Sequence, residues 1–104
     1  MKLKNTDFLP AEDEDLLDVE DLLRDVVCSM VDREGDVRIE FRYPSLDLVS
    51  ADIFVHESEV GLVLGAKGSR SRALQEIFNA VYGKLRRRLT LYVAPTGPRR
   101  ERRR

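Results

Sequence analysis

One short segment combines the residue types that a phosphate-binding loop needs: Gly65-Ala66-Lys67-Gly68. The two glycines permit sharp backbone turns and carry no side chain that would hold a sugar-phosphate chain away. Lys67 adds a mobile positive charge. A helical pattern begins directly afterwards at Ser69, and the free amides at a helix N-terminus attract anions. The segment therefore predicts contact with the phosphates of an extended anionic chain.

The first turn of that helix is basic, because it contains Arg70 and Arg72. A helix dipole favours acids at this end, and acids do occupy the starts of the two other predicted helices, at 12–15 and 57–59. Basic residues in this position are explained if a phosphate binds there. Two alternatives stay open: a merely solvated helix start, or neutralisation of these cations by acids near the N-terminus.

Charge is distributed unevenly along the 104 residues, whose net charge is −1. Residues 1–60 contain 6 Lys+Arg and 17 Asp+Glu, whereas residues 61–104 contain 12 and 2. This asymmetry favours an anionic partner for the basic half, although the two halves can also neutralise each other within the fold. No apolar run is long enough to span a membrane, and the N-terminus lacks the apolar segment of a secretory signal.

A single cysteine, Cys28, excludes an intrachain disulfide. It falls on an apolar helical stripe, so we expect a buried, inert thiol. Together with the absence of a secretory signal, this favours a cytoplasmic location.

Hydrophobic periodicity predicts six elements around the loop. Apolar residues three and four apart predict amphipathic helices, and alternation predicts strands, the first of which Pro44-Ser45 should break. The expected order is helix, strand, strand, short helix, long helix and strand, over residues 10–33, 37–43, 48–55, 57–64, 69–86 and 89–93. In the second strand the buried face should carry Val49, Ala51, Ile53 and Val55.

The segment Val63-Leu64-Gly65-Ala66-Lys67-Gly68-Ser69 resembles the hydrophobic-hydrophobic-Gly-x-x-Gly loop of KH domains. The element order resembles the type II arrangement, in which a helix and a strand precede a strand–helix–helix–strand unit. From about Asp18 to Val93 the chain is similar to the small single-KH RNA-binding proteins of bacteria, the KhpA type. The resemblance implies an α+β fold, with a three-stranded sheet packed against three helices. It divides the chain into an acidic N-terminal extension (1–14), a KH domain (15–94) and a disordered arginine-rich tail (95–104).

The resemblance implies a non-enzymatic RNA-binding protein that acts on single-stranded RNA as a chaperone or post-transcriptional regulator. Its loop would clamp the backbone of about four nucleotides, and the bases would lie in an apolar groove whose far wall holds Ile53 or Val55. The predicted RNA-binding residues are Gly65, Ala66, Lys67, Gly68, Ser69, Arg70, Arg72, Val60, Val63 and Leu64. The chain departs from the family pattern at Ala66 and Ser69, where basic residues are common.

Other chemistry finds little support in the sequence. His56 is the only histidine, so we expect it on the surface or in a cap, and no second Cys or His completes a zinc site. The acids at 12–15 lack calcium-loop spacing. Ser58, Ser69 and Ser71 have no histidine partner for a nucleophilic triad. We therefore expect no enzymatic activity, no metal and no cofactor.

A second hypothesis is a protein-interaction adaptor that keeps the KH fold and binds a partner protein through its helices. The acidic half favours this hypothesis, because it would repel RNA from one face. The resemblance also implies pairing with a second KH protein, as a homodimer or a heterodimer.

Overall fold

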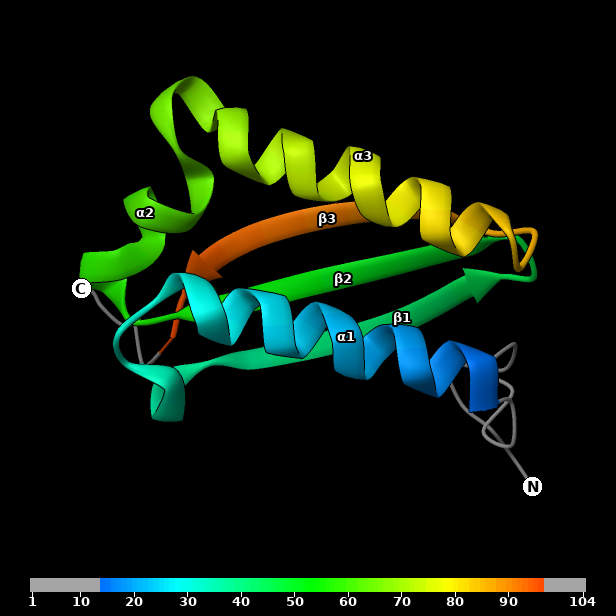
Figure 1. Cartoon of the computed structure of the whole chain (residues 1–104), viewed down its shortest axis with the longest axis horizontal. Coiled ribbons are helices and arrows are strands. Elements are labelled where there is room, and N and C mark those ends of the chain that lie inside the picture. The colour runs from blue at the N-terminus through cyan, green and yellow to red at the C-terminus, as the bar shows by residue number, and fades with distance from the viewer. Residues whose placement is uncertain (1–13, 97–104) are drawn as a thin grey trace.

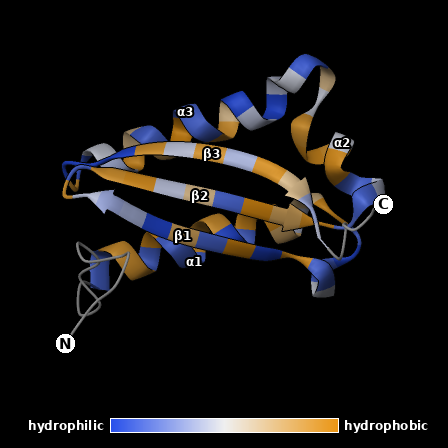
Figure 2. Ribbon diagram, turned by 180° about the vertical axis from the view of Figure 1, so that it is seen from behind, coloured by the Kyte–Doolittle hydropathy of each residue, from blue (hydrophilic) through white to orange (hydrophobic). Residues whose placement is uncertain are grey.

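A computed structural model describes residues 14–96, and in it α1 and α3 lie over one face of a three-stranded sheet while α2 lies at its end (Figure 1). The view from behind shows the opposite face of the sheet without helices (Figure 2). The helices and strands are α1 (Glu14–Met30), β1 (Arg38–Ser45), β2 (Leu48–Val55), α2 (Val60–Leu64), α3 (Ser69–Gly83) and β3 (Arg88–Pro95). Short 3-10 turns at Glu34–Asp36, Glu57–Glu59 and Ala66–Gly68 precede β1, α2 and α3. The predicted α+β class, with three strands and three helices in this order, is confirmed.

Most of the predicted acidic extension (1–14) and most of the predicted arginine tail (95–104) lie outside the described residues.

The strand order is β1-β2-β3, with β1 antiparallel to β2 and β3 parallel to β2. Parallel neighbours cannot be joined by a hairpin, so the chain must cross over one face of the sheet. α2, the Gly65–Gly68 loop and α3 make this crossover. The central strand is buried as predicted, since Val49, Ala51, Ile53 and Val55 are all 0% exposed.

Pro44, which the sequence predicts as a break, lies inside a strand, and Pro95 is the last residue of another. β1 continues through Pro44 to Ser45, and its register with β2 shifts between Arg42 and Ser45. This local irregularity accommodates a residue that cannot donate a backbone hydrogen bond. Pro95 lies at the end of β3, which is an edge strand, where a missing amide is tolerated.

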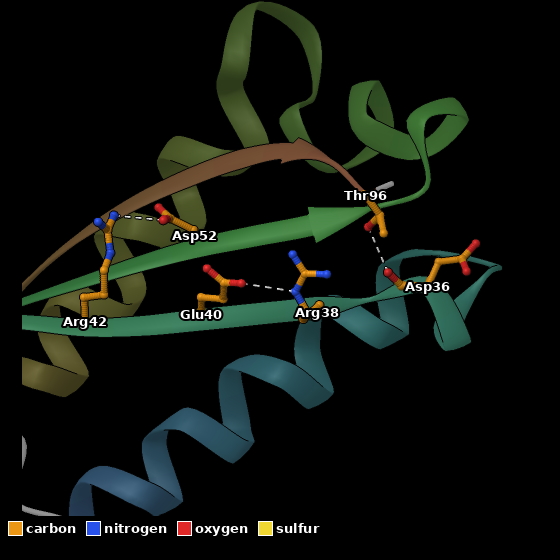
Figure 3. Close-up of polar contacts among 6 residues, drawn as sticks. All are labelled: Asp36, Arg38, Glu40, Arg42, Asp52 and Thr96. Carbon is orange, nitrogen blue, oxygen red and sulfur yellow. Dashed lines mark hydrogen bonds and ion pairs between the residues drawn. The ribbon is translucent and has the colours of Figure 1, made fainter. Parts of the chain in front are cut away.

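Thr96 extends the described structure beyond the domain boundary expected at residue 94. Its backbone N–H donates to Val55 O at 2.7 Å, and its Oγ1 donates to Asp36 O at 2.9 Å (Figure 3). These bonds tie the end of β3 to the turn before β1.

The core is one cluster between the helices and the covered face of the sheet. α1 contributes the residues that face the sheet directly, Leu16, Val19, Leu23 and Val27. The apolar stripe in the sequence of α1 is wider than the face that the helix buries, because Leu17 and Leu22 are 40% and 47% exposed. A single helix on a sheet buries a narrow line of side chains, so the flanks of the stripe stay in solvent. Cys28 is only half-buried rather than buried, and desolvation raises the pKa of its thiol.

Two tyrosines are buried in this core with different hydrogen bonding. Tyr43 of β1 donates its hydroxyl to the Glu20 carboxylate of α1. Burial raises the pKa of Glu20 and that of Tyr43 above their usual values. The hydroxyl of Tyr82 on α3 is also buried, but within residues 14–96 it has no hydrogen-bond partner.

Removing each tyrosine hydroxyl should therefore have opposite consequences. Tyr43→Phe should lower the free energy of unfolding by about 1–2 kcal/mol, because the half-buried Glu20 carboxylate loses its donor. Tyr82→Phe should leave the free energy unchanged or raise it by about 1 kcal/mol, because a buried hydroxyl without a partner is removed. Urea denaturation of the two variants at neutral pH measures both effects. Equal losses in the two variants would contradict this account of the core.

Candidate nucleic-acid interface

The Gly65–Gly68 loop reverses the chain between α2 and α3 by means of positive backbone angles. Gly65 ends α2 with φ 75° and ψ 175°, and its N–H donates to Gly61 O at 2.8 Å. Lys67 and Gly68 follow in the left-handed region, at φ 56° and φ 77°. Gly68 N–H donates back to Gly65 O at 3.0 Å. The loop thus turns on itself, and the side chains of Ala66 and Lys67 are exposed at its apex.

The two glycines are required for different reasons. At Gly65 a Cβ atom would lie 2.8 Å from the backbone nitrogen of Arg70, and its φ/ψ combination is essentially restricted to glycine. At Gly68 a Cβ atom would meet the Arg72 guanidinium at 3.1 Å, and that side chain can move. The left-handed conformation of Gly68 is one that asparagine and aspartate also tolerate.

Arg70 and Arg72, predicted to hold phosphates, also bind the loop itself. Arg70 Nη1 donates to Leu62 O at 2.8 Å, and Arg72 Nη1 donates to Lys67 O at 2.7 Å. Ser71 adds a bond from Oγ to Gly68 O at 3.1 Å. The basic residues in the first turn of α3 thus have a structural role, since they donate hydrogen bonds to carbonyls of α2 and of the loop. Each guanidinium has five N–H donors, and both arginine residues are exposed.

Neutralisation of the basic half by the acidic half, the alternative left open by the sequence, does not occur through ion pairs among residues 14–96. The ion pairs that these residues make with one another all join partners that precede residue 61. They are Arg24–Asp21 at 3.0 Å, Arg38–Glu40 at 3.3 Å and Arg42–Asp52 at 2.8 Å, of which Figure 3 shows the last two. Within the described chain, Lys67, Arg70 and Arg72 are not engaged by a carboxylate.

The apolar wall predicted from the sequence is largely inaccessible. Val63 is 0% exposed, as are Ile53 and Val55, so all three belong to the core and offer no surface to a base. Val60 and Leu64 are half-buried. The side chain of α2 that reaches the surface is Leu62, which is 42% exposed and which the sequence prediction omitted. A helix of five residues has little more than one turn. The rotation of that turn about the helix axis determines that Val63 is buried and that Leu62 is exposed.

Two hollows lie near the loop, and both are lined by residues of α3 and not by residues of α2. A shallow depression of about 580 Å³ is lined by Ser69, Arg72, Ala73, Gln75, Glu76 and Asn79. A second one, of about 220 Å³, is lined by Leu48, Gln75, Asn79, Arg88, Leu89 and Thr90. Because they share Gln75 and Asn79, the two form a continuous path from the loop along α3 to β3. This path is polar, in contrast to the apolar groove predicted.

Gln75 and Asn79 fix α3 against β3. Asn79 Nδ2 donates to Leu89 O at 3.0 Å, and Asn79 Oδ1 accepts from Leu89 N at 2.7 Å. Gln75 Oε1 accepts from Leu91 N at 2.9 Å. Only the position of β3 beside α3 reveals what these amides bind.

The remaining candidates have structural roles. His56 Nδ1 accepts from Ser58 N at 3.1 Å, which confirms a capping role. Glu59, which the sequence analysis did not single out, is buried and accepts the N–H groups of Asp32 and Arg33 at 2.7 and 3.2 Å. It thereby ties the end of α1 to the start of α2. Residues 14–96 contain no group of three His, Cys, Asp or Glu residues that could hold a metal ion, and none of their helices is long and apolar enough to cross a membrane.

Comparisons of the chain with protein-family models, with curated proteins and with solved structures gave no match. The interpretation of this site therefore depends on its own geometry.

Alanine at the two loop glycines should separate their roles. Gly65→Ala should lower the free energy of unfolding by about 2–3 kcal/mol, because the strained backbone and the contact with Arg70 N act together. Gly68→Ala should lower it by about 1–2 kcal/mol, the cost of the left-handed conformation alone. Chemical denaturation measures both values. A larger loss for Gly68→Ala would contradict the geometry described for the loop.

Proposed function

We propose that this chain is a single-KH RNA-binding protein, of type II element order, whose Gly65–Gly68 loop holds the backbone of single-stranded RNA. The observation that carries the proposal is the loop itself. Its positive backbone angles present Lys67 at an exposed apex, directly before the N-terminus of a 15-residue helix. The helix–strand–strand–helix–helix–strand order around it supports the family assignment.

Phosphates would bind at the apex of the loop. Lys67 is exposed, and Arg70 and Arg72 retain N–H donors beyond those that bind the loop carbonyls. Because these two arginines are already fixed by the loop, ordering them for a ligand costs little additional side-chain entropy. The nucleobases of the RNA would then lie along the polar path beside α3, near Gln75, Glu76 and Asn79. Such a site binds and positions RNA, and we propose no catalytic step for it.

The adaptor hypothesis is the second candidate, and the exposed apolar side chains of the helical layer favour it. Leu22 of α1 and Ile77 of α3 are 47% and 60% exposed. A protein contact through such residues would respond weakly to salt, whereas RNA binding weakens steeply as salt rises, because counterions are released from the phosphates.

Reversing the charge of the loop apex tests the proposed function. Single-stranded RNA should bind the unmodified protein in low salt, and the variant Ala66→Asp/Lys67→Asp should bind roughly tenfold or more weakly, because carboxylates repel phosphates there. The fold should persist, since both side chains are exposed and aspartate tolerates a left-handed conformation. Fluorescence anisotropy at two salt concentrations measures the affinity, and circular dichroism checks the fold.

The matched control makes the same two residue changes at the other end of α3, as Ala80→Asp/Lys84→Asp. Both positions are exposed, and the change in net charge is identical. This control should lose far less affinity than the loop variant. Equal losses would show that only overall charge matters, and unchanged affinity in the loop variant would remove RNA binding from this loop.

A further inference from the structure

The two edges of the sheet differ in how their backbone groups are satisfied. On β3, side-chain amides of α3 bind the outward N–H and C=O of Leu89 and the outward N–H of Leu91. Pro95 ends that strand without an amide. These are the devices by which proteins protect an exposed edge from pairing with another strand.

The free backbone groups of β1 follow from the register. Val55 O accepts from Thr96 N, directly beyond β3, so the odd-numbered residues of β2 direct their backbone groups toward β3. Its even-numbered residues therefore face β1, where they pair with Arg38, Glu40 and Arg42. The odd-numbered residues of β1 consequently direct their N–H and C=O groups outward. These are Ile39 and Phe41, which lie within the regular pairing, whereas Tyr43 lies where the register shifts. No side chain within residues 14–96 binds the backbone groups of Ile39 and Phe41 as Asn79 and Gln75 bind β3.

Side chains on the open face of β1 alternate in charge. Arg38, Glu40 and Arg42 follow one another along the strand, as Figure 3 shows. All three are about half exposed, at 56%, 52% and 52% of their side-chain surface. Alternating charge on an edge strand discourages most partners, but it is complementary to its own sequence read in the opposite direction.

An antiparallel pair of β1 strands related by a two-fold axis at Phe41 satisfies both features. The outward groups of Phe41 meet those of the partner's Phe41, and Ile39 meets the partner's Tyr43. Glu40 then lies opposite the partner's Arg42 in a pair without backbone hydrogen bonds, where side chains approach most closely. The whole register lies within Arg38–Ser45.

Neighbouring registers are worse. An axis at Glu40 places Glu40 opposite the partner's Glu40 and Arg38 opposite the partner's Arg42. An axis at Arg42 places Arg42 opposite the partner's Arg42. Both registers are unfavourable, because like charges directly opposite each other are destabilising. An axis at Ile39 restores opposite charges but requires Asp36 as a strand residue. Asp36 belongs to a 3-10 turn, and its carbonyl already accepts from Thr96 Oγ1.

We propose that two copies of this chain pair through their β1 edges in the Phe41-centred register. The two sheets then join into one, with both helical layers on the same face. This interface involves neither the Gly65–Gly68 loop nor any residue of the proposed RNA site, so it stands or falls independently of the proposed function.

Disulfide trapping tests the register directly. In a Cys28→Ser background, a chain carrying Glu40→Cys is mixed with a chain of different length carrying Arg42→Cys. The two positions should lie about 4.5 Å apart between Cα atoms, within the range of about 4.4–6.8 Å that a disulfide requires. A disulfide-linked heterodimer is expected on mild oxidation. The matched control mixes Glu40→Cys with Arg38→Cys, which are neighbours only in the Ile39-centred register, and it should cross-link at least tenfold less.

Sedimentation equilibrium without RNA tests the association itself. The unmodified protein should show the mass of a dimer at high protein concentration. The Glu40→Arg variant should show the mass of a monomer, because it places arginine opposite the partner's Arg42. Glu34→Arg makes the same charge change at an exposed position outside the strand and should stay dimeric. A monomer at all concentrations would overturn the proposal. The charges of β1 would then serve only to prevent strand pairing, or residues 1–13 of the same chain would cover the edge. Preferential cross-linking of the 38–40 pair would overturn the register.

Discussion

The parallel pairing of β2 with β3 determines where the crossover helices and the loop between them must lie. It requires a crossover connection over one face of the sheet, and it makes β2 the central strand, whose inward residues are completely buried. α3 covers the β3 side of that face, and α1 covers the β1 side (Figure 1). The loop lies where the crossover changes direction, between its short and long helices. The position of the candidate site is thus a consequence of strand topology.

The loop has a conformational cost that its neighbours offset. Lys67 adopts a left-handed conformation, which costs a residue with a side chain about 1–2 kcal/mol. Arg72 binds the carbonyl of that same residue, and Arg70 binds the last turn of α2. These bonds keep the apex in a shape that places a cation in solvent, so the arginines position the loop as well as carrying charge. Under the proposed function, a structural role and a phosphate-binding role coincide in the same side chains.

Patterns that depend on neighbours in sequence were predictable, and those that depend on neighbours in space were not. The order of the elements and the buried face of β2 follow from periodicity alone. The extent of β1 and β3 does not, because whether a proline ends a strand depends on where its missing amide points. The same limit applies to Val63, whose burial is fixed by the phase of one helical turn, and to Gln75 and Asn79, whose partners belong to β3. Gly65 was recognised by its spacing, but the contact that requires glycine there, with Arg70 N, is visible only in three dimensions.

Under the proposed function, RNA binds at the loop and along α3, on the helical side of the sheet. Titration of the protein with single-stranded RNA, followed in the amide NMR spectrum, tests it most directly. The largest shifts should fall on residues 62–72 and continue to Gln75 and Asn79. Shifts confined to the open face of the sheet, at Arg38, Phe54 and Tyr92, would contradict it, because that face carries exposed arginine and aromatic side chains but no part of the loop.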